Sequence, residues 1–306
     1  MRETLIKTLP APAHQLTITA APLHTLLLLA DSALPLGSFA FSNGLESFLA
    51  HHRPSPPSAS QVPAFHRFLD LSLSTLCTTS LPYVLASYRH PEQILSLDND
   101  FDASTPCTVA RRASTAQGRA LLSVWDRSFR AHYQSASDSS SHGGTASTGA
   151  KKNGAGDGDS SDEDSPLPTA AASAAAAVQA AITALQAFQS ALRNPETDSF
   201  ASLPANAHLA PLWGLVTRVL QLPLADSAYL FVFAHARTLT SAAVRASVLG
   251  PYQAQAVLAS GALQAKIRTL IAEHWDRSVE EAGQSVPAMD LWVGRHEKLY
   301  SRIFNS

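Results

Sequence analysis

Apolar side chains recur every three or four residues along most of this chain of 306 residues. Such spacing places them on one face of an α-helix, whereas a half-buried strand requires strict alternation. No stretch combines alternating hydrophobicity with hairpin turn residues, so strands are not expected. The pattern predicts an all-α, single-domain bundle of about eight to ten helices.

Five segments carry the helical pattern most clearly. They span residues 62–77, 109–124, 170–192, 223–246 and 254–271. The fourth segment begins with a proline, which suits a first helical turn, and a Gly-Pro pair separates it from the fifth. The third segment is rich in alanine, which favours helix by propensity.

Three other segments are expected to lie outside the packed helices of the domain 21–306. Residues 1–20 contain prolines that interrupt any helix, so they predict a flexible tail, and residues 53–63 form a Pro-rich linker. Residues 135–168 contain no aromatic side chain and cannot bury enough surface to offset their ordering entropy. We expect a disordered insert there. A phosphorylated acidic segment around Asp162 is the functional alternative.

Composition excludes several classes of function. The formal net charge of −2 gives no reason to expect nucleic-acid binding or a polybasic membrane contact. Two cysteines, Cys77 and Cys107, are too few for a disulfide framework or a thiolate metal cage, and they indicate a reducing compartment. The apolar run at 26–30 is too short to span a bilayer. We therefore expect a soluble, cytoplasmic protein.

The sequence offers no motif for metal binding or catalysis. His51 and His52 are adjacent, so on a helix they point about a hundred degrees apart. Neither His-x-His nor Cys-x-x-Cys occurs, although ligands distant in sequence could still converge in the fold. Ser38 lacks the glycine pattern of a nucleophile elbow, and there is no phosphate-binding loop. No catalytic residue, metal site or bound cofactor is expected.

The segment 28–46 is more specific than this background. It is expected to form the end of a helix, then a turn at Pro35 and Gly37, then a short helix that carries Phe39 and Phe41. A tight helical corner explains the glycines, because they allow close approach of two backbones.

Two further segments stand out in the second half of the chain. Small residues at 241–245 allow another helix to approach closely, and Arg245 among them would need a carboxylate or carbonyl partner. The segment from Met289 to Ile303 is expected to form one helical face. Its aromatic and arginine content is typical of an interface hot spot, and docking on the protein's own core explains it equally well. Both interpretations can hold.

Taken together, these segments resemble the UreF family of urease accessory proteins. The resemblance is carried, in order along the chain, by Ala33–Glu46, His208–Gly214, Ser241–Arg245 and His296–Phe304. The chain departs from the family pattern around Leu249, which puts the contacts of that turn in doubt. The insert and the linker resemble eukaryotic, fungal elaborations.

The resemblance implies an all-α homodimer with no enzymatic activity of its own. Such a protein bridges a UreD-type scaffold, called UreH in some bacteria, to the nickel-carrying GTPase UreG. This assembly acts on apo-urease and supports GTP-dependent nickel insertion. Nickel and GTP are then handled by partner proteins and are not bound directly by this chain.

The motifs and the resemblance together predict a set of partner-binding residues. They are Pro35, Gly37, Phe39, Phe41, Gly44, Glu46, Arg245, Arg295, His296, Glu297, Tyr300, Ser301, Arg302 and Phe304. Two other classes of protein stay open. One is a helical adaptor unrelated to urease, and the other is an all-α hydrolase with dispersed catalytic residues.

Overall fold

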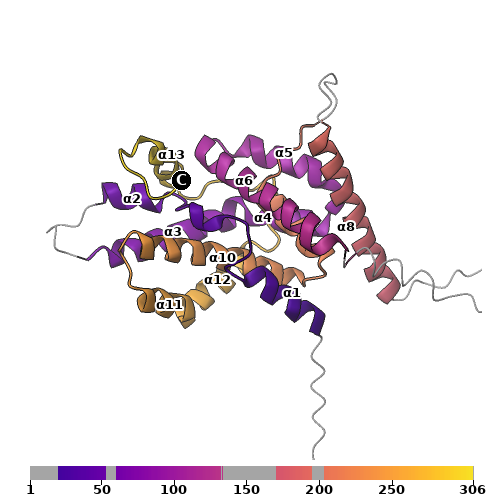
Figure 1. Cartoon of the computed structure of the whole chain (residues 1–306), viewed down its shortest axis with the longest axis horizontal. Coiled ribbons are helices and arrows are strands. Elements are labelled where there is room, and N and C mark those ends of the chain that lie inside the picture. The colour runs from indigo at the N-terminus through magenta and orange to yellow at the C-terminus, as the bar shows by residue number, and fades with distance from the viewer. Residues whose placement is uncertain (1–19, 53–59, 132, 134–169, 195–202, 306) are drawn as a thin grey trace, which may run out of the picture.

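Figure 1 shows the computed structural model of the chain, in which helices pack on helices. The structure describes residues 20–52, 60–131, 133, 170–194 and 203–305. These residues form no strand, so the all-α prediction is confirmed for them. None of their helices is long and apolar enough to cross a bilayer.

The described helices follow one another along the chain, and short 3-10 or π helices lie next to some of them. They are α1 (Ala20–Ala30), η1 (Ser38–Ala40), α2 (Leu45–His51), α3 (Val62–Thr79), α4 (Leu81–Arg89), η2 (Pro91–Gln93), α5 (Ile94–Ser104), α6 (Thr108–Val124), η3 (Trp125–Phe129), α8 (Ala170–Arg193), α9 (Leu209–Val219), α10 (Leu224–Arg245), α11 (Pro251–Ala259), α12 (Gly261–Glu273), α13 (Ala288–Arg295) and η4 (His296–Lys298).

Helix α9 lies at the centre of the bundle and is buried along almost its whole length. It packs most extensively against α4, with α5, α6, α8 and α10 also in contact. At the crossing with α4, a Cβ on Gly214 would lie 2.1 Å from the Val84 carbonyl oxygen. Across the same contact, Ser87 Oγ donates to the Pro211 carbonyl oxygen at 2.5 Å. Glycine is therefore required for the two backbones to approach so closely.

The helix predicted at 223–246 is confirmed as α10. The series predicted at 254–271 is divided in the structure into α11 and α12. Ser260 causes the division, because its side chain accepts a hydrogen bond from Leu263 N at 3.2 Å and caps the second helix.

The segments predicted to lie outside the helices fall mostly beyond the described residues. The tail 1–20 does so except for Ala20, with which α1 begins. Residues 53–59 of the linker 53–63 also lie outside the described residues. Its last two residues are the first two of α3, where proline suits the first turn. The insert 135–168 lies wholly outside the described residues.

The two ends of the described chain differ in their surroundings. Helix α1 packs on α10, whereas α13 packs on α2, α3 and α6, and the C-terminus lies beside α2 in Figure 1. The single helical face predicted from Met289 to Ile303 is wrong, because α13 ends at Arg295 and the chain leaves the helix after η4. This change of direction brings the last residues back over the loop that precedes α2.

Candidate functional site

The loop between α1 and α2 contains two left-handed glycines. Gly37 has φ of 69° and Gly44 has φ of 87°, values that favour glycine. A Cβ on Gly44 would lie 3.0 Å from the Val293 backbone nitrogen, so α13 approaches the loop closely. The tight corner predicted here is confirmed. The short helix was placed too early, because Phe39 lies in η1 and Phe41 in extended backbone before α2 begins.

Glu46, in the first turn of α2, holds the C-terminal segment against this loop. Its Oε2 accepts from His296 Nε2 at 2.8 Å and from Phe304 N at 3.2 Å. Its Oε1 accepts from Ile303 N at 2.7 Å. The His296 side chain is fully buried, and its Nδ1 has no hydrogen-bond partner in the described part of the chain. An ionised carboxylate only accepts hydrogen bonds, so His296 carries a proton on Nε2.

Arg245, the last residue of α10, links the loop to the C-terminal segment. Its guanidinium donates to the Phe39 carbonyl oxygen, which is the kind of partner that the sequence predicts. The guanidinium carbon lies 4.2 Å from the centre of the Phe304 ring, within cation–π range. Burial lowers the pKa of Arg245, yet an arginine keeps its charge at pH 7. A second link is made by Asn305 N, which donates to the Ala40 carbonyl oxygen at 2.8 Å.

The outer side of this assembly exposes aromatic, aliphatic and charged side chains together. We call it the tail surface and define it by Phe39, Arg295, Glu297, Lys298, Tyr300, Arg302 and Ile303, all of them exposed. Tyr300 is completely exposed, and Phe39 is 68% exposed. In contrast, Phe304 points inward and is only 5% exposed. The segment therefore has an inner anchor and an outer face, as both interpretations of the sequence allow.

An ion pair fixes the tail surface to α6. Arg112 Nη2 donates to Glu297 Oε1 at 2.7 Å, and this hydrogen bond lowers the pKa of Glu297. An open pocket of about 530 Å³ lies beside the pair, lined by Phe41, Arg112, Ala116, Arg302, Phe304 and Asn305. Its described lining includes two arginines and no carboxylate, so it suits an anionic group.

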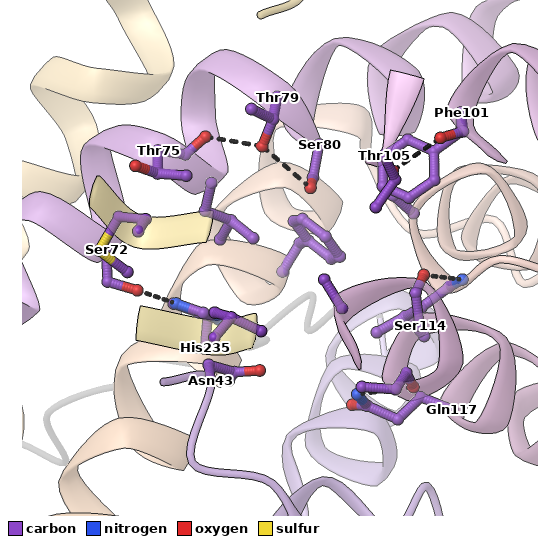
Figure 2. Close-up of a pocket in the computed structure, with 18 of the residues that line it drawn as sticks. Asn43, Ser72, Thr75, Thr79, Ser80, Phe101, Thr105, Ser114, Gln117 and His235 are labelled. Carbon is purple, nitrogen blue, oxygen red and sulfur yellow. Dashed lines mark hydrogen bonds between the residues drawn. The ribbon is translucent and has the colours of Figure 1, made fainter. Parts of the chain in front are cut away.

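An inner cavity of about 340 Å³ lies inside the bundle (Figure 2). Many side chains that bear hydroxyl groups line it. Its described lining residues include one carboxylate, Asp290, and one histidine, His235. Ser72 Oγ lies 2.7 Å from His235 Nε2. Burial lowers the pKa of His235 to about 4, so its imidazole is neutral near pH 7.

Possible metal ligands do not gather in the described residues, where no group of three or more His, Cys, Asp or Glu side chains could hold an ion. Both cysteines are free. Cys77 is buried, and burial raises the pKa of its thiol to about 12, so it is a poor source of thiolate.

Comparison with known proteins decides the family. A family model named UreF matches residues 61–262. A Schizosaccharomyces pombe protein described as a urease accessory protein, UreF-like, is 31% identical over 92% of this chain and 97% of its own length. The chain belongs to the UreF family. "Urease accessory protein 6" of Cryptococcus neoformans is 24% identical over 94% of this chain and 98% of its own length. "Urease accessory protein F" of Arabidopsis thaliana is 26% identical over 91% of this chain and 90% of its own length. These fungal and plant relatives support the expectation of a eukaryotic UreF-family member.

The fold brings most of the predicted partner-binding residues of this UreF-family chain to one end of the bundle. Contacts join Phe39, Glu46, Arg245, His296 and Phe304, which come from three distant segments. The others stand close to them along the chain. That these residues bind partners stays a prediction.

Pro35, Arg295, Tyr300 and Ser301 are all exposed, and none of them makes a contact described above. Their assignment rests on the motifs and the family resemblance alone.

Two contributions to the site escaped the sequence analysis. Arg112 looks like any arginine on an amphipathic helix, and its pairing with Glu297 is a tertiary contact without a local signal. Asn305 contributes through its backbone, which no side-chain motif can mark.

Proposed function

We propose that this UreF-family chain is a scaffold in urease maturation that acts by binding other proteins. In this role it helps to assemble a UreD-type scaffold protein and a UreG-type GTPase on apo-urease. The assembly supports GTP-dependent insertion of nickel, the cargo, into the urease active site. Nickel and GTP are handled by the partners, and the chain contributes no chemistry to this process. Family membership removes the alternative of an adaptor unrelated to urease accessory proteins.

The tail surface is the observation that carries this proposal. Aromatic residues and arginine dominate the energetics of protein interfaces, and Phe39, Tyr300 and Arg302 lie exposed together at this end of the bundle. The Glu46 and Arg245 contacts hold the underlying backbone in place before a partner arrives. Less ordering entropy is then lost on binding.

The charges of the tail surface indicate the partner's complementary surface. Arg295, Lys298 and Arg302 carry positive charge, and Glu297 is the one acid among the residues that define this surface. Since Glu297 is already paired with Arg112, the net field is positive. We propose that the partner presents carboxylates around an apolar socket for Tyr300.

A double variant tests the proposal. Tyr300→Ala with Arg302→Ala removes two exposed side chains, so thermal unfolding should stay unchanged. Binding to the UreD-type scaffold protein, measured by titration or pull-down, should weaken by about tenfold or more. Tyr252→Ala is the matched control, because Tyr252 is a 92% exposed tyrosine on α11. Full binding by the double variant would refute the assignment of this surface.

Deleting residues 292–306 would be a poorer test. The deletion removes His296 and Phe304, which are buried, so the truncated chain should also lose stability. Point variants on the outer face are therefore the better test of partner binding.

We also propose that the chain forms a homodimer through α1. Among the small residues at 241–245 that allow another helix to approach, Ala242 and Ala243 are fully buried within the chain and cannot carry that contact. Helix α1 instead exposes Leu23, Leu27 and Leu28 and contains no charged residue. A row of exposed leucines on one helix favours burial against another surface.

We place this role in the cytoplasm. Both cysteines are free, as is usual in a reducing compartment. The maturation role also requires access to cytoplasmic GTP through the partner GTPase.

A further inference from the structure

Three polar residues from different helices form a line beside the inner cavity. Ser114 Oγ of α6 lies 3.1 Å from His208 Nδ1, at the start of α9. His208 Nε2 lies 3.0 Å from Asp102 Oδ1 of α5. A hydroxyl, an imidazole and a carboxylate in this order are the parts of an activated nucleophile. They are dispersed over the sequence, so no local motif reveals them.

The hydrogen bonds fix the direction of proton transfer in this line. Leu209 N donates to Ser114 Oγ at 3.2 Å, which leaves the hydroxyl hydrogen for another acceptor. Asp102 is an acceptor when ionised, so a neutral His208 carries its hydrogen on Nε2 and accepts at Nδ1. Arg111 Nε lies 3.3 Å from Asp102 Oδ1 and adds a second contact to this carboxylate. Ser114 therefore donates its hydrogen to His208.

The backbone around His208 is held rigidly in place. The buried carboxylate of Asp98 accepts from Asn206 N, Ala207 N and His208 N at 2.6, 3.1 and 2.7 Å. Ala207 has φ of 68°, a conformation that costs energy for alanine. Gly118 lets this backbone approach α6, because a Cβ there would lie 2.0 Å from the Ala207 carbonyl oxygen. Strain held by surrounding contacts is typical of functional sites.

The inner cavity supplies space for a substrate beside Ser114. Its volume of about 340 Å³ is within the range of small-molecule sites. Figure 2 shows Ser114 and Gln117 on one side of it, with Ser72 and His235 on the other. Gln117 Nε2 donates one hydrogen to the Ala113 carbonyl oxygen, and its second hydrogen can stabilise a developing oxyanion. Because the lining is mostly uncharged, it suits an uncharged ligand.

We propose that Ser114 is a nucleophile that accepts acyl groups from small uncharged carboxylic esters, with His208 as its base and Asp102 as a positioning residue. This activity lies beyond the maturation role and does not depend on it. It corresponds to the all-α hydrolase with dispersed catalytic residues that the sequence analysis left open.

The reaction balances without a cofactor. Ser114 Oγ bonds to the ester carbonyl carbon while its proton passes to His208 Nδ1. The ester C–O bond then breaks, and the alcohol leaves with that proton. Water then bonds to the acyl carbon and gives a proton to His208. The bond between that carbon and Ser114 Oγ breaks, Oγ takes the proton back from His208, and the carboxylic acid leaves. The net reaction converts an ester and water into an acid and an alcohol.

A second serine–histidine pair on the same cavity provides a matched control. Ser72 Oγ and His235 Nε2 are 2.7 Å apart, but among the described residues no carboxylate is hydrogen-bonded to the His235 ring. Burial lowers the pKa of His235 to about 4, which makes it a weaker base than an ordinary histidine. Only the Ser114 line should therefore react.

The experiment uses the full chain and p-nitrophenyl acetate. We expect a burst of about one equivalent of p-nitrophenol per chain and an acetyl group on Ser114 by peptide mass spectrometry. Mapping the adduct in the unaltered protein does not depend on how any variant folds. Acetylation confined to Cys107 or to lysines, or no acetylation, would overturn the proposal.

Variants then assign the roles. Ser114→Ala should abolish the burst, and His208→Gln should slow acylation by about a hundredfold. Asp102→Asn should slow acylation and change its pH profile, which a purely structural role would not do. In Ser72→Ala the acetyl group should still form on Ser114, since only Ser114 has a complete relay. Equal loss in Ser72→Ala and Ser114→Ala would count against Ser114.

Discussion

Replacing Glu46 with glutamine should loosen the C-terminal segment while leaving the helices intact. The carboxylate accepts three hydrogen bonds from His296, Ile303 and Phe304, and an amide offers one oxygen in place of two. Leaving buried donors unpaired costs about 1–3 kcal/mol, so the free energy of unfolding should fall by that amount. Urea denaturation measures the change.

Glu92→Gln is the control for the Glu46 variant. Glu92 is an exposed carboxylate whose contact with His90 is 3.5 Å long, and exposed pairs contribute little. Equal stability of the two variants would show that Glu46 does not hold the segment.

His235 should make the stability of the protein depend on pH. Its pKa is about 4 in the folded chain against an ordinary value of 6.5, so protonation favours unfolding. The contribution of neutral His235 is complete above pH 6.5 and is lost as the pH falls toward 4. The loss is on the order of 3 kcal/mol. In His235→Gln this part should disappear, which unfolding experiments between pH 7 and pH 4.5 can detect.

The exposed His24 supplies a comparison for His235, since His24→Gln removes a histidine from the surface of α1. That variant should keep the pH dependence of the original chain. If His235→Gln kept it as well, the acid sensitivity would come from other groups.

At the scale of helices, the crossing of α4 and α9 should not tolerate a side chain at Gly214. In Gly214→Ala the new Cβ would lie 2.1 Å from the Val84 carbonyl oxygen and 2.3 Å from Ser87 Oγ. Since backbone must move to relieve the clash, we expect a loss of about 3 kcal/mol in unfolding free energy. Gly261→Ala at the start of α12 meets nothing within 4 Å and should be neutral or slightly stabilising. Equal melting of both variants would contradict the packing described here.

The helices could be predicted where the apolar periodicity agrees with boundary residues such as proline and glycine. Proline at 223 and the Gly-Pro pair at 250 mark the bounds of α10 closely, and Arg245 ends it. The break between α11 and α12 depends on the cap made by Ser260, a weak signal inside a continuous apolar series. The end of α13 could not be predicted, because backbone donors after it are taken by Glu46, which is far away in sequence.

At the scale of the whole molecule, the candidate site was predictable as a list of residues but not as an arrangement. Motifs selected Glu46, Arg245 and His296 separately, and only the fold shows that they meet. His208 begins one of the motif segments, but no motif marks Asp102, Ser114 and His208 together, since they come from three separate parts of the chain. The local sequence pattern indicates helical periodicity and caps. Which distant side chains meet depends on how the helices pack.

Association of two chains is the last property that belongs to this scale. Leu27 on α1 is 61% exposed, so Leu27→Glu should leave thermal unfolding unchanged in the monomer. In a dimer built on α1, two carboxylates would be moved out of water and toward each other, which strongly disfavours association. Light scattering at micromolar concentration should then report a dimer for the original chain and a monomer for the variant. Leu203→Glu, at a 49% exposed leucine before α9, controls for added charge and should remain dimeric. If Leu27→Glu stayed dimeric, the dimer contact would lie elsewhere than α1. A monomeric original chain would refute the homodimer itself.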